Sequence, residues 1–139
     1  MHNPRRTFLK LLAAAPLTAC AAKSGEPASF GDVSAGNVSD TSVGMLSDVA
    51  GAPALLARDE AGLYAMTITC THEGCDVSPT SDNSLYCPCH GSRFDSNGKV
   101  LAGPAGSPLV HFSVTLGADG TITIHGKEQV AASVRTPVA

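Results

Sequence analysis

The sequence contains no tryptophan, and its 139 residues include only four phenylalanines and two tyrosines. Hydrophobic residues still make up 43% of the chain, so a core of Ala, Val, Leu and Ile is possible. The chain is long enough for one small domain and a tail or two. At this size a core of such small side chains needs additional stabilisation, for which disulfides and metals are the usual source.

A long apolar run is also missing. The longest, residues 11–22, spans about a dozen residues and contains Pro16, whereas a helix that crosses a membrane needs roughly 20. The run follows the basic stretch "RRTFLK" at 5–10 and leads into the small residues "LTAC" at 17–20. A basic start, a short apolar stretch and small residues at a cleavage point predict an export signal over residues 1–19.

Positive charge is scarce beyond that signal. The whole chain has a net charge of −3, and removal of residues 1–19 leaves 6 Lys and Arg against 12 Asp and Glu. This balance gives no indication of nucleic-acid binding.

Helical periodicity is absent outside the signal, so we expect an all-β fold of short strands. A flexible tether over 20–29 precedes a domain over 30–127, and residues 128–139 read as a C-terminal tail. Three hairpins are predicted, at 53–69, at 94–101 around Asn97-Gly98, and at 109–125, with a short strand in "LYC". The segment 102–108 is a Gly/Pro loop.

Two features of the N-terminus resemble known export signals. The paired arginines of "RRTFLK" resemble the twin-arginine signal, whose machinery carries folded proteins, and an ordinary secretory signal is the alternative. "LTAC" resembles a bacterial lipobox, in which the cysteine, here Cys20, becomes the first mature residue and carries lipid. Together they imply a lipid-anchored protein of the bacterial cell envelope that faces the periplasm or another extracytoplasmic space.

The chain has five cysteines, and the odd count is explained if Cys20 is lipidated. The other four lie in "CTHEGC" at 70–75 and "CPCHGS" at 87–92. In extended backbone Cys70 and His72 point the same way, and Cys87 and His90 are three apart in what we expect to be a tight loop. Each motif can therefore offer one thiolate and one imidazole. The remaining Cys75 and Cys89 are natural partners for a disulfide, which persists in an exported protein.

Two cysteines and two histidines can bind either of two metal centres. One is a structural zinc ion in tetrahedral geometry, typical of a module that binds a partner protein. The other is a [2Fe–2S] cluster with two cysteines on one iron and two histidines on the other. Spacing alone leaves both open.

The residues around the ligands favour the cluster. "CTHEGC" and "CPCHGS" resemble the motifs C-x-H-x-G-C and C-P-C-H-G-S of the Rieske iron–sulfur proteins, and "GPAGSP" resembles the proline loop that covers the cluster in that family. The resemblance is specific over these 23 residues and looser from Phe30 to His125. It implies a Rieske-type fold of antiparallel strands in which two loops bind a [2Fe–2S] cluster.

The resemblance also implies a role for each motif residue. These roles are Cys70 and Cys87 as ligands of the inner iron, His72 and His90 as ligands of the outer iron, Cys75 and Cys89 as the disulfide, Gly74 and Gly91 close to the sulfurs, and Ser92 as a hydrogen-bond donor to a bridging sulfide.

The sequence departs from the family pattern at three points. Many quinol-oxidising members have a tyrosine that donates to a cysteine sulfur where this chain has Phe94. The proline loop reads G-P-A-G-S-P instead of the commoner G-P-A-P, and a lipid on Cys20 replaces the uncleaved membrane helix of the cytochrome bc complexes. His111 and His125 lie in strand patterns, where a solvated or hydrogen-bonded histidine is commoner than a ligand. Met45 and Met66 are expected to fill core or surface positions.

The resemblance implies one-electron transfer with a redox partner protein or a quinol-oxidising complex. Because no nucleophile, acid–base pair or substrate pocket is recognisable in the sequence, we expect a carrier or an iron–sulfur subunit rather than a complete enzyme. The hosts to consider are a quinol–cytochrome c reductase-like complex and, alternatively, a molybdenum oxidase similar to arsenite oxidase. A zinc-binding interaction module is the remaining alternative of a different class.

Overall fold

The computed structural model describes residues 29–139. The predicted export signal, the lipidation site Cys20 and almost all of the predicted tether lie outside the described residues. Within the described part no helix is long and apolar enough to cross a membrane.

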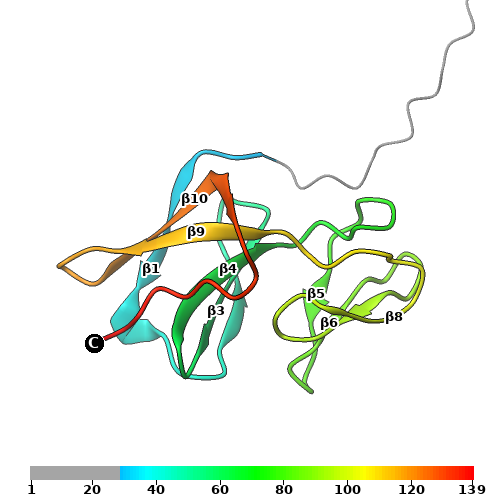
Figure 1. Cartoon of the computed structure of the whole chain (residues 1–139), viewed down its shortest axis with the longest axis horizontal. Coiled ribbons are helices and arrows are strands. Elements are labelled where there is room, and N and C mark those ends of the chain that lie inside the picture. Colours follow the sequence, from blue (N-terminus) through cyan, green and yellow to red (C-terminus); the bar gives the residue numbers. More distant parts are fainter. Residues whose placement is uncertain (1–28) are drawn as a thin grey trace, which may run out of the picture.

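The regular secondary structure of the described chain is almost entirely β-strand, which confirms the all-β prediction (Figure 1). The ten strands are β1 (Asp32–Asn37), β2 (Leu46–Asp48), β3 (Ala54–Asp59), β4 (Gly62–Thr67), β5 (Ser78–Pro79), β6 (Leu85–Tyr86), β7 (Arg93–Phe94), β8 (Val100–Ala102), β9 (His111–Leu116) and β10 (Thr121–Val130), with one 3₁₀ turn at Val38–Asp40.

The strands form two antiparallel sheets. The larger has the order β1-β10-β9-β4-β3-β2, and the smaller has the order β5-β6-β7-β8. Figure 1 shows the small sheet beside the large one, reached by the chain after β4 and left again before β9. The small sheet and its loops are thus an insertion between two neighbouring strands of the large sheet, because β4 also pairs with β9. The three hairpins predicted from the sequence are present as β3–β4, β7–β8 and β9–β10.

The hairpin of β3 and β4 separates two hydrophobic cores. Along each strand alternate side chains point to opposite faces, and here both faces are buried. Leu56 and Leu63 pack in the core of the large sheet, whereas Leu55 and Met66 pack in a second core with residues of the small sheet. This is why the two strands read as continuous apolar runs. Met66 fills a core position, as the sequence analysis predicted.

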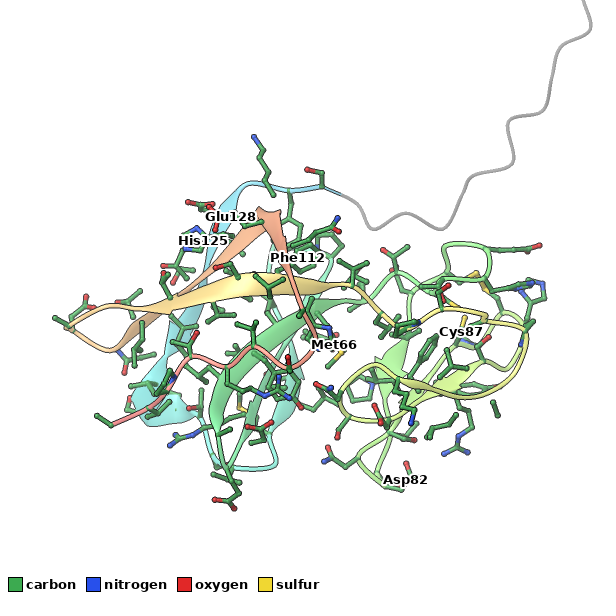
Figure 2. The ribbon with its side chains drawn as sticks, viewed as in Figure 1. Met66, Asp82, Cys87, Phe112, His125 and Glu128 are labelled. Atoms are coloured by element: carbon green, nitrogen blue, oxygen red, sulfur yellow. A yellow bond between two sulfur atoms is a disulfide. The ribbon has the colours of Figure 1, made fainter. Side chains whose placement is uncertain are left out.

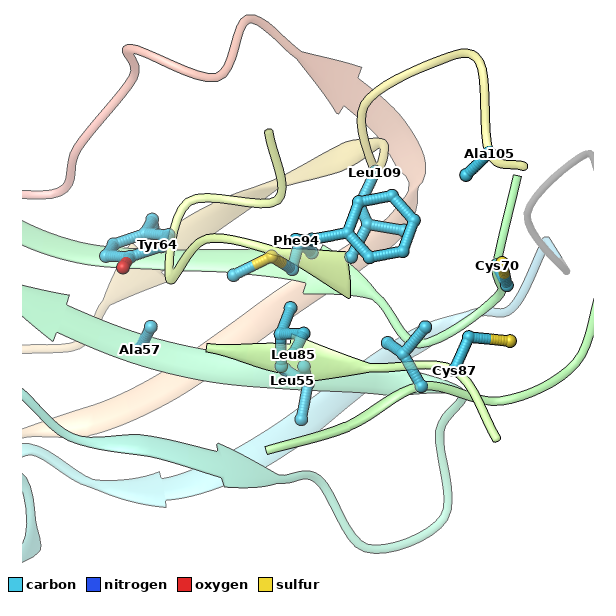
Figure 3. Packing of buried hydrophobic residues seen from close by; sticks show 11 residues of the cluster. Leu55, Ala57, Tyr64, Cys70, Leu85, Cys87, Phe94, Ala105 and Leu109 are labelled. Carbon is cyan, nitrogen blue, oxygen red and sulfur yellow. The ribbon is translucent and has the colours of Figure 1, made fainter. Parts of the chain in front are cut away.

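The second core ends at the motif cysteines. Figure 3 shows Cys70 and Cys87 at one end of this cluster, which also contains Leu85, Phe94 and Leu109. Phe94 is fully buried, and burial of a side chain of this size contributes roughly 1.5–3 kcal/mol. The same apolar contacts that hold the small sheet on the large one therefore fix the start of both motifs.

The C-terminal boundary differs from the sequence prediction. The expected tail at 128–139 begins inside β10, which continues to Val130 after a register shift between His125 and Gln129. Beyond it, Thr136 pairs with Leu63 of β4 through two backbone hydrogen bonds of 2.9 Å. This packing could not be predicted from the sequence, because the segment has no clear periodicity and its contacts are made with a strand some 70 residues away.

Candidate metal centre

The two motifs form two loops with the same backbone turn. In the first, the amide of Cys70 donates to the carbonyl of Cys75 (2.8 Å), and the amide of Gly74 donates to the carbonyl of Cys70 (2.9 Å). In the second, Cys87 and Ser92 make the first of these bonds (2.9 Å), and the amide of Gly91 donates to the carbonyl of Cys87 (3.0 Å). Each loop therefore begins with a cysteine whose backbone is fixed on both sides.

Glycine is required in both turns by the backbone. Gly74 and Gly91 each have φ of 78°, in the left-handed region that favours glycine. An added Cβ would meet no protein atom closer than 3.9 Å at either position, so crowding by protein atoms is not the reason. The extended backbone predicted for the first loop is wrong. Residues 71–73 form a turn, so extended backbone is not what brings Cys70 and His72 to one site.

The four motif cysteines divide into a bonded and a free pair. A disulfide joins Cys75 to Cys89 and so connects the two loops. Cys70 and Cys87 are free and buried. Burial raises the pKa of the Cys87 thiol, and the neighbouring Cys70 thiol raises it further. Two buried thiols side by side suit a bound metal, which favours their thiolate form.

The two motif histidines lie together beyond the thiols. The ring centroids of His72 and His90 are 4.8 Å apart, with the rings at 83° to each other. Nδ1 of His72 is buried and has no hydrogen-bond partner among residues 29–139. A buried nitrogen without a hydrogen-bond partner costs free energy unless something binds it. A neutral imidazole nitrogen is a common ligand of metal ions. Nε2 of the more exposed His90 lies 3.5 Å from Oε2 of Glu73.

The proline loop covers this pair of loops and is tied to both. Thr71 Oγ1 donates to the carbonyl of Ser107 (2.6 Å), and the amide of Ala105 donates to Ser92 Oγ (3.1 Å). Ser92 is fully buried, and because its oxygen accepts from Ala105, its own proton remains free to donate. A Cβ on Gly103 would lie 2.5 Å from Cα of Ser92, so the loop can approach this closely only with glycine there.

The structure brings the motif residues together, and it gives the described histidines outside the motifs, His111 and His125, other partners. Ring nitrogens of His111 lie 3.2 Å from the Leu109 carbonyl and 3.3 Å from Asn97 Oδ1, and His125 contacts Asp32 and Thr115. The position of Glu73 beside His90 and the hydrogen bond between Thr71 and Ser107 were not predicted from the sequence. Glu73 could have been noticed as a charge inside the first motif, whereas the hydrogen bond depends on two loops that meet only in the folded chain.

Two buried thiols, two adjacent imidazoles and one free hydroxyl proton suit a centre with two metal ions in different surroundings. The thiols lie at the end of the apolar core and the imidazoles lie nearer to solvent. A [2Fe–2S] cluster with unlike ligands on its two irons fits this gradient. A single tetrahedral zinc ion could use the same four ligands.

Comparison with known proteins identifies the centre. A family model described as the Rieske [2Fe-2S] domain matches residues 32–113. The chain is 49% identical over 57 residues to the cytochrome b6-f complex iron-sulfur subunit of Synechococcus elongatus, covering 39% of this chain and 32% of that protein. It is 42% identical over 66 residues to the carotenoid phi-ring synthase of Chlorobaculum tepidum, covering 47% of this chain and 10% of that protein. The chain thus spans about a third or less of the length of these curated relatives.

Solved structures show the same fold. The crystal structure of the cyanobacterial plasma membrane Rieske protein PetC3 from Synechocystis PCC 6803 aligns with a TM-score of 0.54 and 28% sequence identity, over 66% of this chain and 97% of that chain.

Proposed function

Because this chain belongs to the Rieske [2Fe–2S] domain family and therefore carries a Rieske-type [2Fe–2S] cluster, we propose that its function is one-electron transfer. The observation that carries the proposal is the pair of matched loops, which presents two thiols and two imidazoles to one place. Bound there, the cluster supplies reversible one-electron chemistry.

We assign the ligands by burial. Cys70 and Cys87, buried at the end of the core, hold the inner iron, and His72 and His90 hold the outer iron. The unpartnered Nδ1 of His72 supports this assignment. The disulfide between Cys75 and Cys89 holds the two loops at a fixed separation, so that all four ligands stay in place without a protein rearrangement.

The neighbouring residues tune the site. Ser92 directs its free proton toward the cluster, since its oxygen is already occupied by the Ala105 amide. Phe94 contributes apolar packing and has no donor to offer. The proline loop, held by Thr71 and Ser92, excludes water from the inner side of the site.

We assign the chain to a carrier or to the iron–sulfur subunit of a quinol–cytochrome c reductase-like complex. The cytochrome b6-f relative supports an assignment of this class. The alternative is the small electron-transfer subunit of a molybdenum oxidase similar to arsenite oxidase, which the combination of a predicted export signal and a disulfide favours. In either host the electron passes to or from a redox partner through the histidine side of the loops.

We further propose that the protein is exported by the twin-arginine route and anchored by lipid on Cys20, facing the periplasm or another extracytoplasmic space. The motifs "RRTFLK" and "LTAC" support this location. Mass spectrometry of the native protein tests it. We expect an N-terminus at residue 20 that carries a diacylglyceryl or triacylglyceryl group, and an N-terminus at Met1 would contradict the proposal.

Absorption spectroscopy with iron and sulfide analysis tests the function. The purified protein should be brown, contain about two irons and two inorganic sulfides per chain, and bleach reversibly on uptake of one electron. A colourless protein with one zinc per chain would instead support the structural zinc module.

A further inference from the structure

Glu73 lies at the outer end of the site and has no role in the proposed function. Its carboxylate Oε2 is 3.5 Å from Nε2 of His90, and its side chain is 61% exposed. Ligand atoms of His72, Glu73 and His90 all lie within 4.8 Å of one another. A carboxylate therefore stands at the surface through which an electron passes to a partner.

No lysine or arginine neutralises this carboxylate within the described residues. The arginine ion pairs there are Arg93 with Asp82 and Arg135 with Asp59, and the nearest basic group to Glu73 is the imidazole of His90. Beyond the predicted signal the chain also carries twice as many acidic residues, 12, as Lys and Arg, 6. The surface around His90 is therefore negative both locally and in the field of the whole molecule.

This charge restricts what can cover the site. A partner that encloses the histidines in an apolar pocket would bury the Glu73 carboxylate without a counter-charge, which is strongly unfavourable. A partner that offers lysine or arginine would instead form a charge-assisted hydrogen bond at the centre of the contact. The partner surface that fits is cationic.

We propose that Glu73 is a specificity-determining residue of the electron-transfer surface, and that the partner is a redox protein that presents lysine or arginine beside His90. The inference rests on the proposed function, because it assumes that the electron leaves through the histidine side. It deepens that function by naming the charge of the partner.

Calorimetric titration of the cluster-loaded protein with a small basic c-type cytochrome tests the proposal. Glu73→Gln should raise the dissociation constant about fivefold at low ionic strength, since a unit charge pair near contact in water is worth about one such factor. The difference should vanish toward 1 M salt, where the Debye length is roughly 3 Å. A small acidic cytochrome of similar size should not bind measurably.

Glu128→Gln is the matched control. Glu128 is exposed on β10 and forms no ion pair with another described residue, and Figure 2 shows it on the large sheet, away from Cys87. The Glu128→Gln substitution removes the same charge as Glu73→Gln and should change the dissociation constant less than twofold. Equal effects of the two substitutions would reduce the proposal to net charge alone and overturn it, as would wild-type binding that does not weaken with salt.

The absorption spectrum of the same samples distinguishes a failure of the cationic-partner proposal from a failure of the proposed function. A normal iron–sulfur spectrum with binding that ignores Glu73 contradicts only the cationic partner. Absence of that spectrum contradicts the proposed function itself.

Discussion

At the scale of single residues, four cysteines that look alike in the sequence take two different roles. Cys70 and Cys87 are free and buried, and Cys75 and Cys89 form the disulfide. The motif resemblance predicted this division, because it depends on local spacing that the family shares. The reliance of Ser92 on the Ala105 amide could not be predicted, since 13 residues separate them and only folding brings them together.

Substitution of the free cysteines should differ from substitution of the bonded ones. Cys70→Ser, Cys87→Ser, His72→Ala and His90→Ala each remove a proposed bond to iron and should abolish the cluster. Cys75→Ser removes only the disulfide between the loops, and a disulfide typically stabilises a fold by about 2–4 kcal/mol. The iron–sulfur cluster should therefore still form, but it should decay faster. Iron and sulfide analysis measures both. Loss of all iron in Cys75→Ser with retention in Cys70→Ser would show the assignment to be reversed.

The reduction potential should depend on the hydroxyl of Ser92. A hydrogen bond to a cluster sulfur stabilises the more negative reduced form and so raises the potential. Ser92→Ala should lower the potential by some tens of millivolts to about 100 mV, because a bond to a charged group is worth about 1.5–3 kcal/mol and only the difference between oxidation states counts. Phe94→Tyr adds a hydroxyl donor to the hydrophobic core that contains Cys70 and Cys87, and it should raise the reduction potential.

Protein-film voltammetry measures both shifts under one set of conditions. Ser92→Thr keeps the hydroxyl and serves as the control for the loss of the donor. A higher potential in Ser92→Ala would mean that the hydroxyl does not point to the cluster.

The buried His111 should make the fold sensitive to acid. Burial lowers the pKa of His111, and the charge of Arg135 lowers it further. Below the ordinary histidine pKa of about 6.5 the unfolded chain therefore binds a proton that the folded chain resists, so stability falls as pH falls through this value. Denaturant unfolding of wild type and His111→Gln between about pH 8 and 5 tests this. The variant should lose less unfolding free energy than wild type as the pH falls. An equal loss in both proteins would show that His111 is not responsible for the sensitivity to acid.

At the scale of elements, the strands were predictable and the C-terminal segment was not. The hairpins β3–β4, β7–β8 and β9–β10 follow from apolar runs and turn residues close in sequence. The segment after β10 contacts both sheets through the side chain of Arg135. Its guanidinium contacts Asp59 Oδ2 (2.6 Å) and Asn97 Oδ1 (2.8 Å), and lies 3.8 Å from the centre of the Tyr64 ring. Such contacts depend on tertiary packing and leave no periodic pattern.

Arg135 should therefore stabilise the attachment of the small sheet to the large one. Arg135→Leu removes a partly buried ion pair, a hydrogen bond to the β7–β8 turn and a cation–π contact, and should cost about 2 kcal/mol of unfolding free energy. Denaturant unfolding measures the loss.

Arg93→Leu is the control, because Arg93 pairs with Asp82 on the exposed surface and such pairs contribute little. It should leave the unfolding midpoint nearly unchanged. An equal loss in the two variants would show that the C-terminal segment does not join the sheets as described.

At the scale of the whole molecule, an apolar hairpin shared between two cores holds a small sheet whose strands are only two or three residues long. A sheet with strands this short is not stable alone, so the disulfide and the iron–sulfur cluster add to the stability that the hydrophobic core provides. The motifs made the function predictable from 23 residues. The identity of the partner depends on the surface that the complete fold presents, and there Glu73 is informative only once His90 lies beside it.

The central claim is that two cysteines and two histidines of this chain hold one [2Fe–2S] cluster. Pulsed electron paramagnetic resonance of the reduced protein, grown with ¹⁵N-labelled histidine, tests it most directly. We predict strong coupling of the unpaired electron to two histidine nitrogens, and loss of that spectrum in His72→Ala and His90→Ala. A reduced cluster without histidine coupling, or no paramagnetic signal at all, would contradict it.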